Sequence, residues 1–470
     1  MRMTKRAAGI FIADAFLLVI SAMFPNMWRM TAILLLWSNM VIYSLSDIEN
    51  NVALLAFLIS FFTFLIGRET LERFGLHTIE SVFSEELNTH AENLLLISLT
   101  VIFVTYMCSK SIKLKTHAQN AQIDYDSVKY KSIREASKWI FYGTYLFDLY
   151  SIVEIIFYVL RHGYAAFYTG FTTNVPYIIG KIGDMSPIAF WVYLSTMPDK
   201  KEAKYPIFLY VIYLSISLGT GKRFRFVAGL LTLLVYLIVR NKVNSRGDVW
   251  FGRRLALVCV LGAPLLLILL VLVSKIRFGT QMTTEELLNS MTGFFYSQGV
   301  SINVIKRTEL YADKLPNGKI YMLGSIIDFL QGNIISRALG VKHYAGNTVE
   351  HALYGNSLEH TLSYVAMGSY YLKGRGLGGC YIAEAFHDLQ YVGVVFINFI
   401  YGIVLNKLFR FETRGIWKSA LTFLFLNSLL LAPRGSADGF FADMVDLSTW
   451  GTFIVIYVFA SMLSKKMKND

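Results

Sequence analysis

The sequence predicts an all-α, polytopic membrane protein with about twelve transmembrane helices. Of the 470 residues, 55% are hydrophobic and only 16% are charged, whereas soluble proteins carry about a quarter of charged residues. Apolar stretches long enough to cross a bilayer recur along the chain, and basic residues concentrate in alternate connections between them. Because lipid offers the backbone no hydrogen-bond partner, these stretches are expected to be helices.

The apolar stretches run from the N-terminus to the C-terminus. They lie at 8–24, 30–45, 52–67, 93–109, 139–160, 186–197, 205–218, 226–239, 255–274, 391–408, 417–432 and 444–463. The first follows Arg2, Lys5 and Arg6 and has no clear cleavage site after it. It is therefore interpreted as a retained first helix and not as a signal peptide.

The distribution of Lys and Arg predicts the orientation of these helices. With the N-terminus in the cytoplasm, more than half of the 44 basic residues lie in or beside the cytoplasmic connections. The short external connections hold few. Both termini are therefore predicted to be cytoplasmic. The net charge of +12 is explained by this anchoring, so no nucleic-acid partner is expected.

One long segment divides the chain into three parts. Residues 1–274 hold the first nine predicted helices, residues 275–390 have no obvious span, and residues 391–470 hold the last three. The segment 275–390 mixes apolar helical pieces with glycines and charges, so a folded, partly helical external domain is expected. Long ordered connections usually carry function. No internal repeat is visible, which counts against a secondary transporter.

Basic residues occur at three predicted external positions. Lys222, Arg223 and Arg225 lie in Gly219-Thr-Gly-Lys-Arg-Phe-Arg225, Arg277 ends a span, and Arg434 lies in Pro433-Arg-Gly-Ser436. Each can be a side chain that reaches lipid phosphates. Arginine also presents a planar fork that suits phosphate. Cations from distant parts of the chain on one side therefore predict a site for a multiply charged ligand, such as a diphosphate leaving group.

A glycine-rich sequence, Gly374-Arg-Gly-Leu-Gly-Gly-Cys-Tyr-Ile-Ala-Glu-Ala-Phe-His-Asp388, precedes the tenth predicted helix. It contains GxGxxG, but a dinucleotide site needs a preceding strand in a soluble βαβ unit. The glycines are instead expected to let the chain turn into a helix. Glu384, His387 and Asp388 share one helical face. This face is either a polar helix end in water or a group that activates a hydroxyl.

The histidines and cysteines of the chain are potential metal ligands. His343, His351, His360 and His387 lie in the long segment, without HExxH or comparable ligand spacing, so no metal site is predicted. His360 remains a further candidate proton acceptor. The three cysteines are far apart in sequence and predict no structural disulfide.

Several of these motifs together resemble one enzyme family. They are GTGKRFRF, SKIRFG, FFYSQGVSINVIKR, NSLEHTLSYVAMGSYYLKGRGLGGCYIAEAFHDLQYVGVVFINFIYG and APRGS. The pattern resembles the Wzy-type oligosaccharide repeat-unit polymerases of O-antigen and capsule assembly. The resemblance runs from about residue 205 to the end of the chain. The N-terminal third is similar to the family only in hydropathy.

The resemblance implies a GT-C-like fold, similar to the O-antigen ligases, and an active site on the outer face of the bacterial inner membrane. It implies a glycosyltransferase that moves the growing glycan from undecaprenyl diphosphate to the non-reducing end of a new lipid-linked repeat unit. No metal, ATP, nucleotide sugar or other cofactor is expected. The expected partners are the lipid-linked oligosaccharide, the bilayer, and a chain-length regulator and a flippase of the same pathway.

The site residues follow from the motifs and the resemblance together. The cations expected to bind the diphosphate are Lys222, Arg223, Arg225, Arg277, Arg375 and Arg434. The candidate proton acceptors are Glu384, His360 and His387.

Three alternatives remain open. An O-antigen ligase differs mainly in its acceptor. A flippase of lipid-linked sugars can also have about twelve spans, but it is expected to have short external loops and a central cationic cavity. An ion-coupled transporter is favoured only by acids within predicted spans, such as Asp14, Asp148 and Glu154. Cations at external junctions and a long external segment favour an enzyme.

Overall fold

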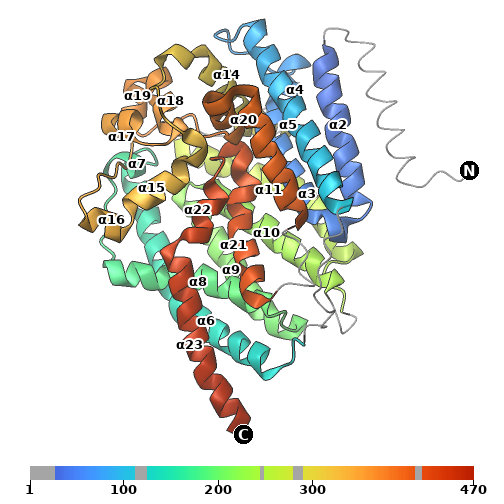
Figure 1. The fold of residues 1–470 in the computed structure, drawn as a ribbon, viewed down its shortest axis with the longest axis vertical. Helices are drawn as coiled ribbons and strands as arrows, with labels where there is room; N and C mark the ends of the chain where they lie inside the picture. The colour runs from blue at the N-terminus through green and yellow to red at the C-terminus, as the bar shows by residue number, and fades with distance from the viewer. Residues whose placement is uncertain (1–26, 112–123, 244–247, 279–288, 408–414, 470) are drawn as a thin grey trace, which may run out of the picture.

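The computed structural model describes residues 27–111, 124–243, 248–278, 289–407 and 415–469. Within these ranges every regular element is helical (Figure 1), so the all-helical prediction is confirmed for the described chain. The helices of the first part are α2 (Trp28–Leu45), α3 (Ile48–Phe61), α4 (Gly67–Arg73), α5 (Glu85–Ser111), α6 (Val128–His162), α7 (Ala166–Gly170), α8 (Tyr177–Ser195), α9 (Lys200–Ser217), α10 (Arg223–Lys242) and α11 (Arg253–Phe278).

The second part begins with short helices and ends with long ones. The short helices are α13 (Ser290–Gln298), α14 (Ser301–Leu310), α15 (Gly324–Gly332), α16 (Ile334–Ala338), α17 (Val349–Tyr354), α18 (Leu358–Met367) and α19 (Ser369–Leu372). We call residues 289–372 the short-helix segment. The remaining elements are α20 (Tyr381–Lys407), α21 (Ile416–Leu431), the 3-10 turn η7 (Ala432–Arg434), α22 (Gly439–Val445) and α23 (Leu447–Asn469).

Nine helical stretches of the described chain are long and apolar enough to cross a membrane. They are Ile48–Arg73, Glu85–Lys110, Val128–His162, Lys200–Thr220, Arg223–Lys242, Arg253–Val273, Tyr381–Lys407, Ile416–Arg434 and Gly439–Met467. Nine of the predicted spans lie in or overlap these stretches. The predicted span 8–24 lies outside the described residues, whereas 30–45 and 186–197 fall on α2 and α8, which are not among the nine.

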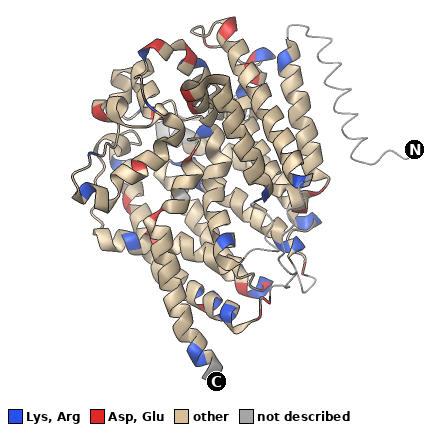
Figure 2. Ribbon diagram, in the orientation of Figure 1, with Lys and Arg blue, Asp and Glu red and all other residues tan. Residues whose placement is uncertain are grey.

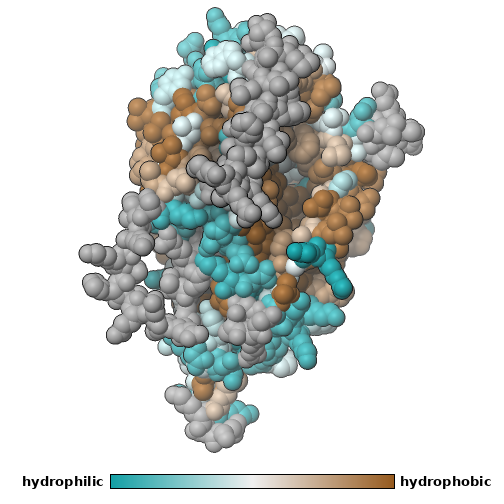
Figure 3. All heavy atoms as spheres, turned by 90° about the vertical axis from the view of Figure 1, so that its right-hand side faces the viewer, coloured by the Kyte–Doolittle hydropathy of each residue, from teal (hydrophilic) through white to brown (hydrophobic). Residues whose placement is uncertain are grey.

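Charge and hydropathy divide the surface of the bundle. Lys and Arg gather at its lower end, around the start of α6 and the end of α23, and most of the ribbon between the two ends carries other residues (Figure 2). A side view shows apolar surface over much of the upper half of the described atoms, below a hydrophilic upper tip, and hydrophilic surface over most of the lower half (Figure 3). Several short helices, among them α14 and α17 to α19, gather at the opposite, upper end (Figure 1).

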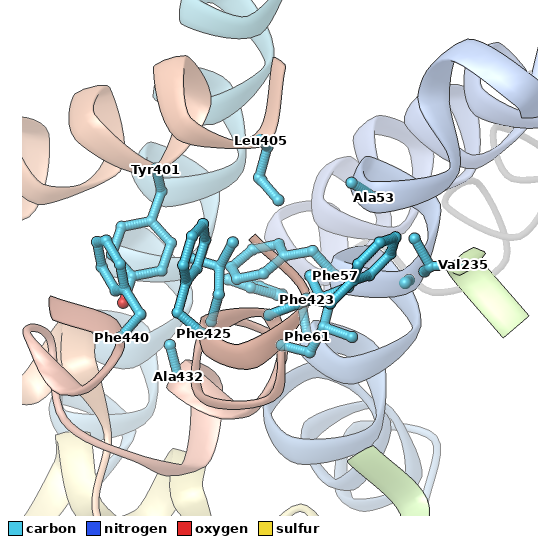
Figure 4. Close-up of a cluster of buried hydrophobic side chains, with 14 of the residues drawn as sticks. Ala53, Phe57, Phe61, Val235, Tyr401, Leu405, Phe423, Phe425, Ala432 and Phe440 are labelled. Carbon is cyan, nitrogen blue, oxygen red and sulfur yellow. The ribbon is translucent and has the colours of Figure 1, made fainter. Parts of the chain in front are cut away.

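An aromatic core joins helices that are distant in sequence (Figure 4). The Tyr401 ring of α20 lies 5.8 Å from Phe57 of α3 and 5.5 Å from Phe440 of α22, measured between ring centroids. Lipid tails are as apolar as these side chains, so close packing and buried hydrogen bonds must hold helices together in a bilayer. Tyr401 supplies both, because its hydroxyl donates to the carbonyl of Ala437 at 3.0 Å.

Buried ion pairs fasten the short-helix segment to α4. Lys306 of α14 is fully buried, and its Nζ lies 2.6 Å from Glu69 Oε2 and 3.7 Å from Glu72 Oε2. Arg68 bonds Glu72 at 2.7 Å and the Tyr296 hydroxyl at 3.1 Å. A buried charge is tolerated only when it is paired, so these contacts hold the start of the segment in place.

The long helix α20 contains a break. Leu389 and Gln390 have non-helical backbone angles, and Gln390 has a positive φ of 52°. A side chain added at Gly393 would lie 2.1 Å from the carbonyl oxygen of Ala385, so only glycine fits where the two pieces meet. The break separates the piece that carries Glu384 from the apolar piece 391–407.

Candidate active site

The connection 432–438, between α21 and α22, is the centre of the site. Its first residues form the turn η7, which Pro433 favours because its fixed φ suits the start of a helical turn. On one side the backbone of Ala437 bonds two side chains of α20: its N–H donates to Glu384 at 2.8 Å and its carbonyl accepts from Tyr401. The apolar core therefore positions this connection.

The other side of the connection holds the short-helix segment. The carboxyl group of Asp438 accepts hydrogen bonds from the backbone N–H groups of Ser325 and Ile326, at 3.3 and 2.8 Å. These are the first N–H groups of α15, which have no partner within that helix. The Ser436 and Ser325 hydroxyls are 2.7 Å apart. The start of α15 is thus capped from a distant part of the chain.

Arg434 projects from η7 towards three parts of the chain. Its guanidinium donates to the carbonyl of Gln298 at 3.1 Å and lies 5.6 Å from the Phe64 ring centroid. It also lies close enough to Glu359 of α18 for its positive charge to favour the ionised carboxylate. Arg434 therefore stands where α13, α18 and the end of α21 meet.

Glu359 is exposed to solvent, yet burial raises the pKa of its carboxyl group, against the opposite effect of Arg434. A carboxyl group with both properties lies in a recess of the protein. A side chain added at Gly376 would come within 4.0 Å of Glu359 Oε1. Glycine at this position therefore leaves space beside the carboxyl group.

The glycine-rich sequence forms the turn that leads into α20. Gly374 has a positive φ of 83°, and an added side chain would lie 2.2 Å from the carbonyl oxygen of Ala165. Gly379 packs against Gly435, with 3.3 Å between an added Cβ and the carbonyl carbon of Gly435. These glycines let α7, the turn and the connection 432–438 approach one another.

The predicted face of Glu384, His387 and Asp388 is present, and each group already has a partner. Glu384 is buried and within electrostatic reach of Glu359, Asp388 and Asp438. Asp388 accepts the backbone N–H of Met322 at 2.7 Å, and His387 Nδ1 lies 3.0 Å from Asp388 Oδ1. These groups join α20 to the short-helix segment.

His360 lies one residue after Glu359 and has different neighbours. Its Nδ1 is 2.9 Å from the Tyr371 hydroxyl, and its ring centroid lies 3.9 Å from that of His351. Burial, with a smaller effect from His351, lowers the pKa of His360 to about 4. The imidazole is therefore neutral at pH 7.

The cations of the α9–α10 junction contact other elements. Lys222 Nζ lies 3.7 Å from the Phe167 ring centroid of α7. Burial, and to a smaller extent the charge of Arg225, lowers the pKa of Lys222 to about 8. Arg223 donates to the Leu270 carbonyl at 3.0 Å, and Arg225 donates to the Tyr213 hydroxyl at 3.2 Å.

The structure thus brings some predicted site residues together. Arg434 and Glu384 belong to one site, which His387 adjoins through Asp388. Lys222 reaches the same end of the molecule through α7, because the carbonyl of Tyr168 accepts the backbone N–H of Asn347 at 3.5 Å. Arg375 is exposed beside the Tyr370 ring. The Arg277 side chain lies outside the described atoms.

Sequence reasoning missed Glu359 as a site residue. It directly precedes His360, which the sequence analysis named as a candidate proton acceptor. Its burial and the electrostatic effect of Arg434, 75 positions away, distinguish Glu359 from other exposed glutamates. Among the described residues, no group of three or more His, Cys, Asp and Glu side chains is arranged to hold a metal ion.

A bundle of apolar helices with ionisable groups gathered beside a segment of short helices defines a multi-pass membrane protein with a polar site. The sequence model of one family, O-antigen polysaccharide polymerase Wzy, matches residues 7–467. The chain belongs to this family, and is therefore a glycosyltransferase-type polymerase of O-antigen repeat units. No curated protein and no solved structure matches the chain.

Proposed function

We propose that this polymerase transfers the growing glycan from undecaprenyl diphosphate to a hydroxyl group at the non-reducing end of a new lipid-linked repeat unit. The observation that carries the proposal is that Arg434 and Glu359 lie within electrostatic reach of each other. They combine a cation suited to a diphosphate with a carboxyl group suited to accept a proton.

The reaction leaves negative charge on the departing diphosphate and removes a proton from the acceptor hydroxyl. The bond between the anomeric carbon and the diphosphate oxygen breaks, and undecaprenyl diphosphate leaves with the electron pair. The acceptor hydroxyl oxygen forms the new glycosidic bond, and its proton passes to Glu359. Arg434 stabilises the negative charge that develops on the leaving diphosphate, an effect that grows towards the transition state.

The raised pKa of Glu359 supports its role as the base. A carboxylate with an ordinary pKa is a weak proton acceptor, and a raised pKa brings it closer to the operating pH. Glu384 and Asp438 then position the connection that carries Arg434 through their hydrogen bonds. Lys222, and with it Arg223, is proposed to guide the diphosphate from the side of α7.

The proposal includes the orientation of the protein in the membrane, the absence of a metal ion from the reaction and the partners of the enzyme. The active site faces the outside of the inner membrane, both termini lie in the cytoplasm, and the reaction proceeds without a metal ion. A chain-length regulator and a flippase of the same pathway are the proposed partners. The family match supports a polymerase over the flippase, ligase and transporter alternatives.

The direct test is chain extension by the purified protein supplied with undecaprenyl-diphosphate-linked repeat units. Arg434→Lys keeps the charge but loses the planar fork, so kcat is expected to fall about a hundredfold with little change in KM. Arg337→Lys, at an exposed arginine of α16, is the matched control. Wild-type chain length from Arg434→Lys would exclude the proposed role of Arg434.

A further inference from the structure

A second space, lined by both charged and apolar residues, begins at the end of α21 that leads to Arg434. A cavity of about 510 Å3, open to the surface on one side, is lined by residues of α6, α8, α9, α10, α21 and the start of α23. Its charged lining residues are Asp148, Lys181, Asp184, Arg225 and Asp446. A volume of this size is typical of sites for small molecules, and the proposed reaction does not use it.

The charges of the lining argue against an anionic ligand. Three carboxyl groups stand against two cations. Lys181 is paired with Asp184 at 2.8 Å, and Arg225 lies within electrostatic reach of Asp148. A diphosphate in this cavity would have to displace these carboxylate partners of Lys181 and Arg225. A neutral molecule rich in hydroxyl groups would not.

The lining also offers hydrogen-bonding groups. The Asp148 carboxyl group is part of the lining and lies within hydrogen-bonding reach of the Tyr213 hydroxyl. Asn427 accepts from the Thr232 hydroxyl at 2.6 Å through its amide oxygen, which leaves its NH2 group for a ligand. Phe224, which also lines the cavity, is 52% exposed. Carboxylates, an amide and an accessible aromatic face suit the hydroxyl groups and the apolar face of a sugar ring.

The cavity is close to Arg434 along the chain. Leu431 lines it at the end of α21, and Arg434 ends the turn that follows immediately. A glycan bound in the cavity would therefore lie at the end of α21 that leads into the turn of Arg434. Thr232 and Asn427 join α10 to α21 at this point.

We propose that this cavity binds an uncharged sugar residue of the lipid-linked repeat unit and so helps to select the glycan. The inference rests on the proposed function, because it takes the same substrate. It differs in assigning the sugar to the cavity and the diphosphate to the neighbourhood of Arg434.

Protection of a cysteine from labelling tests the occupant directly. Ser448→Cys places a thiol in the lining, in an active variant whose own Cys108, Cys259 and Cys380 are replaced. Ser81→Cys, in an exposed connection outside the cavity, is the matched control. The two probes are the repeat-unit oligosaccharide freed from its lipid and undecaprenyl diphosphate without sugar.

The expected result is that the free oligosaccharide slows maleimide labelling at position 448 several-fold and leaves position 81 unchanged, while undecaprenyl diphosphate protects neither position. Equal or stronger protection of position 448 by undecaprenyl diphosphate would overturn the proposal, as would no protection by either probe. The result does not depend on the role of Arg434, so failure here is distinct from failure of the proposed reaction.

Kinetics provide a second, independent measurement. Asp148→Asn and Asp446→Asn keep the shape of the lining but remove carboxylates that accept sugar hydroxyls. Each is expected to raise KM for the lipid-linked repeat unit about tenfold with kcat nearly unchanged. Asp313→Asn, at an exposed aspartate of the short-helix segment, is the control. An unchanged KM in both cavity variants would contradict sugar binding there.

Discussion

The carboxyl group of Glu384 accepts the backbone N–H of Ala437 at 2.8 Å, across 53 positions of the chain. The bond fixes the connection that carries Arg434 against α20. Because the donor is a backbone group, an acceptor of the same shape can replace the carboxylate. Replacing the carboxylate by an amide of the same shape therefore distinguishes a positioning role for Glu384 from a role in proton transfer.

Glu384→Gln is therefore expected to keep most of the polymerase activity, since its amide oxygen can still accept the N–H of Ala437. Glu384→Ala leaves that buried N–H without a partner, which costs about 1–3 kcal/mol, and is expected to lower both activity and stability. Chain extension and thermal unfolding in detergent check both variants. Complete loss of activity in a stable Glu384→Gln protein would instead identify Glu384 as the proton acceptor.

Glu359→Gln is expected to abolish chain extension, because the amide cannot take up the acceptor proton. In the wild-type protein kcat should fall as the pH falls through the pKa of Glu359, because protonation removes the base. Burial raises this pKa, so the loss should occur above the pH at which an ordinary glutamate titrates. A pH–rate profile measures it. Glu350→Gln, at an exposed glutamate of α17, is the control, and an unchanged profile in Glu359→Gln would refute the assignment.

Lys222 is expected to make substrate binding sensitive to alkaline pH. Its pKa is lowered to about 8, so the ammonium group is charged below that pH and loses its charge above it. KM for the diphosphate-linked substrate should therefore rise as the pH passes through about 8. Lys222→Arg, which stays charged, should remove this dependence. A KM that is independent of pH from 7 to 9 in the wild type would argue against contact between Lys222 and the diphosphate.

Lys306→Met is expected to destabilise the protein severely. It removes one of the two cations that pair with each of the buried carboxylates of Glu69 and Glu72 and leaves only Arg73 and Arg68 beside them. Removing one partner of a buried ion pair costs about 3–5 kcal/mol. Glu85→Gln, which alters a largely exposed partner of Arg73, should have little effect. Thermal unfolding in detergent compares the two, and equal melting temperatures would show that the buried pairs do not hold the short-helix segment.

Activity is expected to survive removal of divalent metal ions. In the proposed reaction Arg434 and Lys222 neutralise the diphosphate, the task that a metal ion performs in many transferases. Chain extension measured with and without EDTA tests this. Loss of activity that magnesium or manganese restores would show that the cations of the chain are insufficient.

The sequence by itself determined that the protein is helical, that it spans a membrane many times and that it resembles the repeat-unit polymerases. These properties follow from local information. A long apolar run predicts a membrane helix wherever it lies in the chain. Motifs such as APRGS and the glycine-rich turn before Tyr381 are likewise contiguous in the sequence. The positions of Arg434 and Glu384 were predicted in the same way.

Only the tertiary structure decided which charged groups meet. Glu359 lies within electrostatic reach of Arg434, and Lys306 is buried against Glu69. Arg225 joins the carboxylates of a cavity and not a purely cationic site. Each pairing links residues that are far apart in the chain. Helical periodicity assigns a residue to a face of its own helix, but packing decides which helix that face meets, and the low dielectric of the interior then makes the pairing strong.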